Sequence, residues 1–343
     1  MAGGATGSTP RERALLDAVR GGDEDAFRRI VEPHWADLHA HCYRMLGSLH
    51  DSDDALQETL LRAWRALPRF GGPGLLRPWL YRIATNVCLD ALARHPRRLL
   101  PIDHGSPSGP DDDPGAPLAE SVWVEPYPDR ELGLEDGYAA PAASYERREA
   151  VELAFIVALQ HLPARQRAVL ILRTVLGFTA SEVAQQLDTT VASVHSALHR
   201  ARRSAAERLP ERSQQATLRS LGDASVRQIV ERYMDAWERG DVEALAALLA
   251  EDATFAMPPY ARWWRGRDLI AAFAAQPVHR YLPARANGQP ANAAYRWDPE
   301  SGRYVAEALE VLTLEGAIVK EMIAFMTPDV FPRFGLPGAL SPR

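Results

Sequence analysis

The sequence is poor in cysteine and lacks a long apolar run. Two of its 343 residues are cysteine, Cys42 and Cys88, which is too few for a disulfide scaffold and favours a reducing compartment. No uninterrupted apolar stretch reaches the roughly 18 residues of a membrane span. The first ten residues lack the basic and apolar regions of a secretion signal. We therefore expect a cytoplasmic protein without a membrane partner.

Catalytic and metal-binding motifs are also missing. The sequence has no glycine-rich phosphate loop and no nucleophile elbow. His34 and His41 cannot share a metal ion, because residues seven apart on a helix are separated by about 10.5 Å. His39 and Cys42 together give only two ligands. We therefore expect no cofactor, no metal and no enzymatic activity.

The chain as a whole has no excess of positive charge, but two of its segments do. The net charge is −6, yet residues 62–98 carry eight arginines against one acid and residues 151–210 carry seven against four. Residues 101–150 lie between these two blocks and carry three arginines against twelve acids. Paired basic blocks on predicted helices favour a polyanionic partner over merely solvated faces.

Breaks in the helical periodicity divide the chain into domains. Residues 101–147 are rich in Pro, Gly and Asp and have no period, which predicts a linker. The expected order is an N-terminal helical domain at 11–100, the acidic linker at 101–147, a helix-turn-helix domain at 148–210, a joint at 211–224 and an α+β domain at 225–335. The expected fold class is thus multidomain, with two all-α domains and one α+β domain.

The N-terminal domain shows helical spacing throughout. Apolar residues recur from 27 to 49, which predicts one helix with a buried stripe that includes Trp35. Residues 51–54 (DSDD) offer N-cap chemistry for the next helix, and Pro78 suits the first turn of a third. Around that third helix arginines alternate with aromatic rings, an arrangement that suits unpaired bases. Taken alone, an aromatic core with solubilising arginines is the better interpretation of this segment.

A helix-turn-helix is predicted near residues 179–203. Thr179-Ala-Ser-Glu182 forms a capping box, and Asp188 stands where the turn needs left-handed backbone. In the second helix small polar residues would reach base edges and arginines would reach phosphates. The outward positions are Ala192, Ser193, His195, Ser196, His199, Arg200, Arg202 and Arg203. A helical hairpin with a solvated basic face is the alternative, and DNA binding is favoured.

Both helical blocks resemble one family. Residues 51–64 (DSDDALQETLLRAW) and 77–86 (RPWLYRIATN) resemble the N-terminal domain of bacterial sigma-70-type factors. Residues 162–167, 176–184 and 196–202 resemble the promoter-binding domain of the same factors. No other sigma domain lies between them, which is the pattern of the extracytoplasmic-function group. The resemblance implies a sigma factor that directs core RNA polymerase to promoter DNA.

The resemblance also assigns roles to residues, with the clamp helices and flap of the polymerase as protein partners. Docking on the clamp helices falls to Asp54, Gln57, Glu58, Leu61 and Trp64. The resemblance assigns melting and holding of the −10 element to Arg77, Trp79, Arg82, Asn86, Arg94, Arg97 and Arg98. The loop 71–76 would receive an extruded base, and the helix at 191–203 would read the −35 element.

Two positions depart from the family pattern. His195-Ser196-Ala197 stands where many members have Lys-Ser-Arg, and Leu60 replaces a common Phe. The first departure leaves the −35 sequence open, and the second leaves the detail of polymerase docking open. The acidic linker either occupies the nucleic-acid channel of the polymerase as a mimic or is a plain tether.

Residues 225–343 have a different pattern. Two helices precede strands expected at 253–257, 291–297, 303–314 and 317–326, which predicts a curved antiparallel sheet with helices on it. The segments WERGD, EDATF and WRGRDLI resemble the SnoaL-like group of the nuclear-transport-factor-2 superfamily. The resemblance to sigma factors with such an extension implies an intramolecular contact that regulates the sigma domains and the linker.

Folds of this group enclose an apolar pocket. Aromatic residues in a small domain are more often core than pocket lining. The candidate lining residues are Met257, Tyr260, Trp263, Trp264, Tyr295 and Phe325.

Two other functions compete with a sigma factor. The chain could be a ligand-responsive helix-turn-helix regulator that does not enter the polymerase. It could also be a cyclase or isomerase that uses Asp252 and carries a vestigial DNA-binding arm. Neither explains an acidic helix, an arginine–aromatic segment and a helix-turn-helix in this order.

Overall fold

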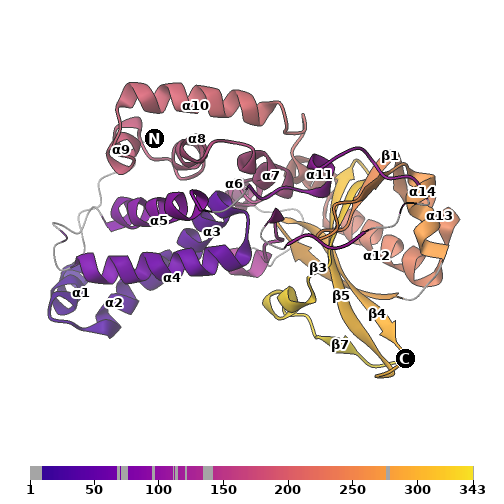
Figure 1. The fold of residues 1–343 in the computed structure, drawn as a ribbon. Coiled ribbons are helices and arrows are strands. Elements are labelled where there is room, and N and C mark those ends of the chain that lie inside the picture. The colour runs from indigo at the N-terminus through magenta and orange to yellow at the C-terminus, as the bar shows by residue number, and fades with distance from the viewer. Residues whose placement is uncertain are drawn as a thin grey trace. The chain divides into compact units, whose positions relative to one another are not determined.

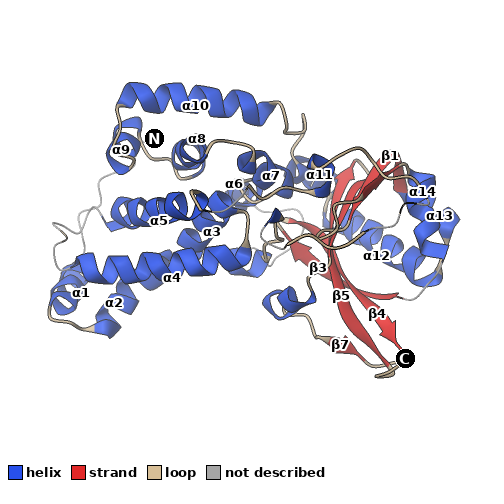
Figure 2. Cartoon of the chain, in the orientation of Figure 1, coloured by secondary structure: helices blue, strands red, loops and turns tan. Residues whose placement is uncertain are grey.

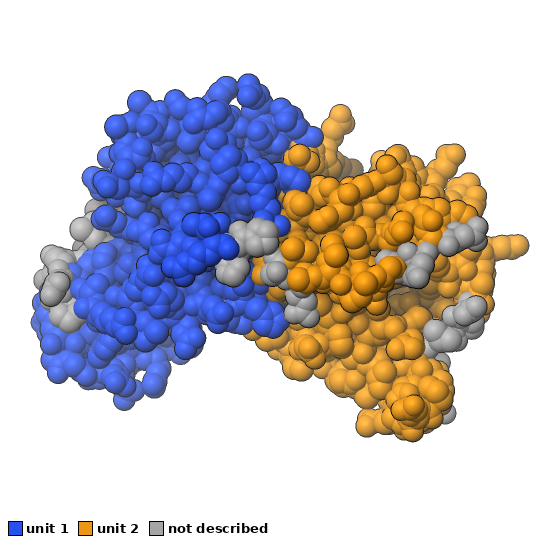
Figure 3. Space-filling model, in the orientation of Figure 1, with its two compact units in different colours: residues 1–97, 158–207 blue, residues 98–157, 208–343 orange. Residues whose placement is uncertain are grey.

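The chain forms two compact units in the computed structural model, and each unit combines separate stretches of sequence. Unit 1 comprises Met1–Arg97 and Ala158–Glu207, and unit 2 comprises Arg98–Val157 and Arg208–Arg343; Figure 3 shows them in two colours. The structure describes residues 10–67, 70, 76–94, 97–110, 112, 115–119, 122–133, 142–275 and 279–342. The expected linker thus belongs to the same unit as the C-terminal domain.

Unit 1 is helical throughout its described residues (Figure 1). Its first stretch contains α1 (Pro10–Arg20), α2 (Glu24–Val31), α3 (Trp35–Leu46), α4 (Leu49–Ala66) and α5 (Leu76–Leu92). Its second stretch contains α8 (Ala164–Leu170), a π-helical turn (Ile171–Val175), α9 (Ala180–Gln186) and α10 (Val191–Ala206). The helix α7 (Leu153–Gln160) precedes α8. Leu38, Leu80 and Ala84 are fully buried between the packed helices α3, α4 and α5.

The apolar stretch 27–49 does not form the single helix that its spacing predicts. A 3₁₀ turn at Glu32–His34 separates α2 from α3. The reason is Pro33, which has no backbone N–H to continue the helical hydrogen bonds. Because of this break Trp35 is 48% exposed instead of buried.

The expected N-cap of α4 is also wrong. Gly47 ends α3 in the left-handed conformation with φ 71°, and the chain turns into α4 earlier than the acidic run 51–54 suggests. Ser48 then adopts extended backbone, and its hydroxyl accepts the Asp51 amide at 3.1 Å. The acidic residues therefore lie inside the helix and not at its cap.

Unit 2 is built on a seven-stranded sheet with the order β2-β1-β6-β5-β4-β3, and β7 pairs with β5. Helices gather along one side of this curved sheet, as Figure 2 shows, and bury Tyr233, Leu245 and Ile270 against it. The helices are α12 (Asp223–Arg239), α13 (Val242–Leu248) and α14 (Arg267–Ala272). The strands are β1 (Leu249–Ala256), β2 (Trp263–Arg265), β3 (His279–Ala286), β4 (Gln289–Asp298), β5 (Arg303–Glu315), β6 (Ile318–Phe325) and β7 (Ala339–Leu340).

The sheet is not purely antiparallel, contrary to expectation. β1 runs parallel to β6, and the other pairs are antiparallel. Alternation of apolar and polar residues indicates which face of a strand is buried but not which way its neighbour runs. The pattern also missed β3, which contains Pro283.

The regions expected as linker and joint are folded onto this sheet. Trp123, Val124 and Tyr127 are buried, and the Ser108 amide donates to Trp263 O at 2.7 Å. The regular parts of these regions are short 3₁₀ turns at Pro101–Asp103 and Asp129–Leu132, and the helices α6 (Ala142–Glu149) and α11 (Gln214–Leu221). Leu218 of α11 is fully buried in the core of the sheet domain.

Candidate functional site

The helix-turn-helix of unit 1 is fixed by local hydrogen bonds. The Thr179 hydroxyl accepts from the Glu182 amide at 3.2 Å, and Glu182 Oε2 accepts from the Thr179 amide at 2.7 Å. This confirms the predicted capping box. Asp188 has φ 49°, which confirms the left-handed turn. The hydroxyl of Thr190 then caps α10 by accepting from the Ser193 amide at 3.1 Å.

All eight predicted DNA-contacting residues of α10 lie on its exposed face. They are Ala192, Ser193, His195, Ser196, His199, Arg200, Arg202 and Arg203. The opposite face is buried through Val194, Leu198 and Ala201. α10 contains no acidic residue, and among the described residues none of its three arginines forms an ion pair. The helix therefore presents an uncompensated positive face.

The residues predicted for the −10 element are divided between the two units. Arg82, Asn86, Arg94 and Arg97 are exposed on or just after α5. Arg98 is different, because its side chain is buried in unit 2, where it donates to Trp123 O at 2.9 Å and pairs with Glu125 at 3.4 Å. Arg98 is therefore a buried residue with partners in its own unit, unlike the four exposed ones.

Two residues of α5 already have partners within unit 1. Arg77 donates to Leu176 O at 3.1 Å, and its guanidinium lies 4.7 Å from the centre of the Phe178 ring. The ring of Trp79 packs against that of Phe70 at 4.8 Å. The predicted base-accepting loop 71–76 lies outside the described residues except for Leu76.

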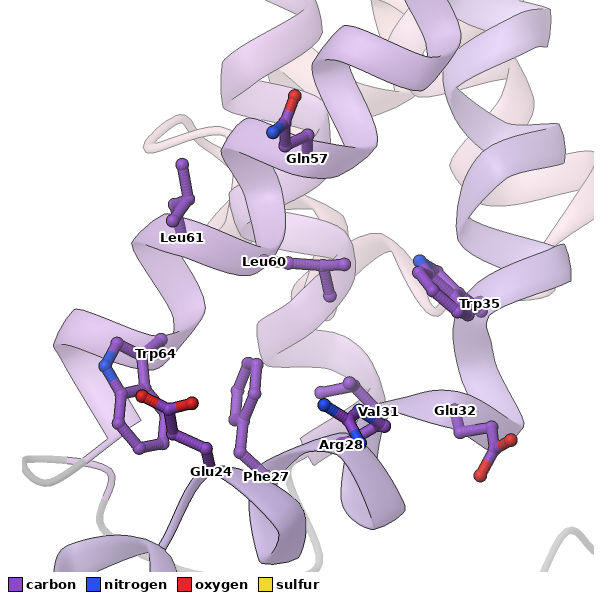
Figure 4. A pocket seen from close by; sticks show the side chains of 10 residues that line it. All are labelled: Glu24, Phe27, Arg28, Val31, Glu32, Trp35, Gln57, Leu60, Leu61 and Trp64. Carbon is purple, nitrogen blue, oxygen red and sulfur yellow. The ribbon is translucent and has the colours of Figure 1, made fainter. Parts of the chain in front are cut away.

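An apolar groove of about 420 Å³ opens between α2, α3 and α4 (Figure 4). Three predicted polymerase-binding residues, Gln57, Leu61 and Trp64, line it. Leu61 is 44% exposed. Asp54 and Glu58 do not line it; Asp54 is exposed, and Glu58 accepts from Arg62 at 2.7 Å.

The second wall of this groove was not predicted from the sequence. It consists of Phe27, Val31 and Trp35, and the Phe27 ring meets Trp64 edge-on at 5.2 Å. The signal was Pro33, which breaks the apolar stretch and turns Trp35 outward. Leu60, the departure from the family pattern, also lines the groove.

The histidines near residue 40 have separate partners. His39 Nε2 lies 3.0 Å from Asp53 Oδ1, and His41 Nε2 lies 2.9 Å from Thr85 Oγ1. Burial lowers the pKa of His41 to about 3, with a further effect of Arg44. No group of His, Cys, Asp and Glu among the described residues is arranged to hold a metal ion.

Buried polar side chains tie distant stretches of unit 1 together. Arg167 donates to Gln160 Oε1 at 2.5 Å, to Leu162 O at 3.3 Å, and to Met45 O. Gln160 in turn donates to Arg44 O at 3.4 Å. We call Arg167 with these partners the Arg167 cluster. It joins the end of α3 to the start of the helix-turn-helix half of the unit.

A second cluster ties the linker to the sheet in unit 2. Asn287, in the turn between β3 and β4, accepts from the Tyr127 amide at 2.9 Å and donates through Nδ2 to Val151 O at 2.9 Å. Its own amide donates to Tyr127 O at 2.8 Å, and the Gly288 amide donates to Asp129 at 2.7 Å. We call these residues the Asn287 cluster; nothing in the sequence pattern indicated it.

Glu152 adds a carboxylate to the same region of unit 2. Its oxygens accept from the amides of Gln214 and Gln215 at 3.2 and 2.6 Å. Burial nevertheless raises the pKa of Glu152 to about 7. The contact joins the start of the helix-turn-helix domain to α11.

The predicted pocket of the sheet domain is lined by a different set of residues. Of the six candidates only Met257 lines the pocket found there, of about 340 Å³. Tyr295 packs on Phe331 at 5.4 Å, Phe325 and Trp264 are core residues, and the Trp263 indole donates to Gly105 O at 2.8 Å. Tyr260 is half-buried outside the lining. Neighbours of Tyr295 and Phe325 in sequence line the pocket instead, because successive strand residues face opposite sides.

Asp252, the residue named for an enzymatic alternative, is not in this pocket. It is half-exposed and pairs with Lys320 and Arg265. The hydrogen bond from Lys320 is the main reason why the pKa of Asp252 is lowered. This carboxyl is therefore an ordinary surface ion pair.

An exposed basic helix in a helix-turn-helix is the arrangement of a DNA-binding transcription protein. Residues 30–98 match Sigma-70 region 2, residues 152–204 match Sigma-70 region 4, and residues 230–322 match a SnoaL-like domain. No helix among the described residues is long and apolar enough to cross a membrane.

The relatives narrow this class to one family. The ECF RNA polymerase sigma factor SigG of Mycobacterium tuberculosis is 40% identical over 324 residues, which cover 92% of this chain and 85% of SigG. The chain therefore belongs to the ECF family of RNA polymerase sigma factors and carries a SnoaL-like extension.

Two further comparisons agree with this assignment. The ECF sigma factor SigW of Bacillus subtilis is 28% identical over 189 residues, which cover 54% of this chain and 90% of SigW. The crystal structure of the M. tuberculosis ECF sigma factor SigJ has a TM-score of 0.55 at 22% identity and covers 88% of this chain and 96% of its own. That similarity concerns the fold.

Proposed function

We propose that this sigma factor recognises promoters through three separate surfaces. The exposed face of α10 reads the −35 element, the exposed residues of α5 hold the melted −10 element, and the groove between α2, α3 and α4 docks on the clamp helices of core RNA polymerase. The observation that carries the proposal is the α10 face, with all eight predicted residues exposed and no acidic neighbour on the helix. It combines base-reading side chains near the N-terminus with phosphate-binding arginines near the C-terminus.

The two sigma halves must separate before the faces of α5 and α10 can contact the −10 and −35 elements of one promoter at the same time. The −10 and −35 elements are centred about 25 base pairs apart, or roughly 85 Å of duplex at 3.4 Å per pair. A globular unit of the size of unit 1 has a radius of gyration of only roughly 15 Å. Within unit 1, Arg77 is engaged by Leu176 and Phe178, and the Arg167 cluster joins both halves. We therefore assign the compact unit to a resting form.

The SnoaL-like extension regulates this opening by holding the linker. Residues 98–133 make backbone and side-chain hydrogen bonds to the sheet domain, including those of the Asn287 cluster and the bond from the Leu118 amide to Pro259 O at 2.9 Å. A linker held in this way cannot extend to let the two sigma halves separate. Its release would also free the acidic segment for contact with the polymerase.

Single-round transcription with core polymerase and full-length protein tests the proposal. Trp79→Ala should lower initiation on a duplex promoter at least tenfold and on a premelted promoter much less, because an aromatic ring that stacks on bases acts during melting. Trp297→Ala, which alters a 38% exposed tryptophan of the sheet domain, is the matched control and should leave both rates unchanged. Equal losses on both templates would remove the melting role.

DNA binding by α10 is tested separately on −35 duplexes with reconstituted holoenzyme. Arg202→Ala should weaken binding evenly across sequences and reduce the salt dependence by about one ion, as a phosphate contact does. Ser196→Ala should instead change which sequences are selected. A chain that neither co-purifies with core polymerase nor initiates on a pool of genomic promoters would contradict the whole proposal.

A further inference from the structure

The helix-turn-helix half of unit 1 contains a hollow beside the exposed face of α10. The hollow has a volume of about 250 Å³ and is lined by residues of α8, of the turn before α10 and of α10 itself. α8 packs against α10 (Figure 1). Ser193 and Arg200, two of the residues of α10 predicted to contact DNA, are among those that line it. The hollow is therefore continuous with the surface assigned to the −35 element.

The inner lining of this hollow is apolar. Val169, Leu187 and Val194 line it and are buried, and Ala197 is half-buried beside them. None of these side chains can donate or accept a hydrogen bond. Ala197 stands where many family members have arginine, and a side chain of that length would occupy the space. The small residue at position 197 therefore leaves the hollow open.

The outer rim of the hollow is polar and positively charged. Arg165 of α8 and Arg200 of α10 are exposed and line it from two different helices. Among the described residues neither arginine forms an ion pair, and a guanidinium group matches the geometry of a phosphate. Gln166, Thr189 and Ser193 line the hollow as well and offer hydrogen bonds to phosphates or base edges. This charge favours DNA over an apolar peptide or small molecule as the neighbour of the rim.

The major groove of DNA offers a single apolar group to such a hollow. Guanine, adenine and cytosine present hydrogen-bond donors and acceptors there, whereas thymine presents an acceptor and its C5 methyl group. A polar base edge would lose water on entering the apolar part of the hollow and would find no partner there. A methyl group instead gains from leaving water.

We propose that this hollow receives the C5 methyl group of one thymine in the −35 element, so that Ala197 is a specificity-determining residue. Arg165 and Arg200 bind nearby phosphates and keep the methyl group at the hollow. The inference rests on the −35 role of α10 proposed above and deepens it by naming the base that the helix selects. Because 5-methylcytosine carries a methyl group at the same ring position, the hollow should accept that base as well.

The test uses the full-length protein in reconstituted holoenzyme and begins with selection of bound promoters from a pool with a random −35 region. Each thymine of the selected element, on either strand, is then replaced singly by deoxyuridine, which removes the C5 methyl group and keeps the pairing with adenine. One position should lose roughly fourfold in affinity, as expected for one buried methyl group, and the others should change much less. At that position 5-methylcytosine should bind more tightly than cytosine by a similar factor.

Variants of the protein link the methyl effect to the hollow. Ala197→Leu should fill it and bring the ratio of thymine to deoxyuridine affinity to about one. Ala206→Leu makes the same change at an exposed position of α10 outside the hollow and should leave the ratio unchanged. Ala197→Ser adds a hydroxyl group with little volume and should also lower the ratio. The base analogues are compared on the unaltered protein, so the inference is tested even if Ala197→Leu does not fold.

Failure of this inference and failure of the proposed function give different results. A holoenzyme that selects no −35 sequence would contradict the role of α10, and the inference about Ala197 would fall with it. A selected −35 element without a methyl-sensitive position, no gain from 5-methylcytosine, or a methyl effect that survives Ala197→Leu would overturn the inference about Ala197 alone.

Discussion

The two units use buried polar side chains for the same purpose but with opposite chemistry. In unit 1 the Arg167 cluster joins distant helices through a cation that donates to carbonyl oxygens. In unit 2 the corresponding contacts involve the amide Asn287 and the carboxyl groups Asp129 and Glu152. Burial lowers the pKa of Arg167 to about 10, so it stays charged at neutral pH. Burial instead raises the pKa values of Asp129 and Glu152.

His41 and Glu152 therefore contribute to the pH dependence of the two units with opposite signs. In unit 1 the buried His41 is held neutral, so acid favours the unfolded chain, which can bind a proton there. In unit 2 the buried Glu152 is held protonated up to about pH 7, so base favours the unfolded chain, which can release that proton. Acidification from pH 8 to 5 should weaken unit 1 and strengthen unit 2.

The largest effect is expected from removal of the buried cation in unit 1. Arg167→Met leaves several buried carbonyl oxygens without donors and should reduce the free energy of unfolding of unit 1 by about 3 kcal/mol. Hydrogen exchange of the full chain, followed by mass spectrometry, should show faster exchange in peptides of α3 and α8 but not of β4. Arg165→Met, an exposed arginine of the same helix, is the control and should change little. Equal effects of both variants would contradict the assignment.

The next effect should come from the linker contact in unit 2. Asn287→Ala removes two buried side-chain hydrogen bonds and places alanine at φ 57°, which should cost about 2 kcal/mol. Exchange should rise in peptides around Tyr127 and leave α3 unaffected. Asn292→Ala is the matched control, because this buried asparagine of β4 does not belong to the Asn287 cluster. If Asn292→Ala exposed the linker equally, the cluster would not be what holds it.

The pH response of unit 1 should follow His41. The folded pKa of about 3 lies below the unfolded value of 6.5, so stability is present above pH 6.5 and falls as the pH drops. Between pH 7 and 5 the loss should reach about 2 kcal/mol, at about 1.4 kcal/mol per pH unit. His41→Gln should flatten this slope in exchange rates of α3 peptides corrected for intrinsic pH effects. An unchanged slope would place the acid-sensitive group elsewhere.

The response of unit 2 should be of similar size and of opposite sign. The folded pKa of Glu152, about 7, lies above its unfolded value of 4.5, so its contribution is complete at low pH and is lost as the pH rises. From pH 5 to 8 the loss should be about 2.5 kcal/mol. Glu152→Gln should flatten the slope measured on α11 peptides, whereas Glu211→Gln, which changes an exposed glutamate just before α11, should not. A rise in stability with pH would contradict the comparison.

The sequence predicted well those features that depend on contacts over three or four residues. The capping box of Thr179, the turn at Asp188 and the exposed face of α10 are confirmed, since each follows from side-chain chemistry next to the backbone it bonds. Pro33 and Ser48 are local signals of the same kind, the first for a helix break and the second for an N-cap. The prediction followed the apolar spacing around them instead. Ala294 and Arg296 line the pocket of the sheet domain, whereas Tyr295 between them does not. A pattern of aromatic residues does not show on which side of a strand each one lies.

The order of the helices, the helix-turn-helix and the sheet, and with it membership of the ECF sigma family, was determined by the sequence alone, because caps, breakers and periodicity act locally. Three features depend on the three-dimensional fold: β1 runs parallel to β6, Arg98 is buried in unit 2, and Asn287 binds the linker 160 residues earlier. These contacts join groups far apart in the chain, and no local spacing records which of them will meet.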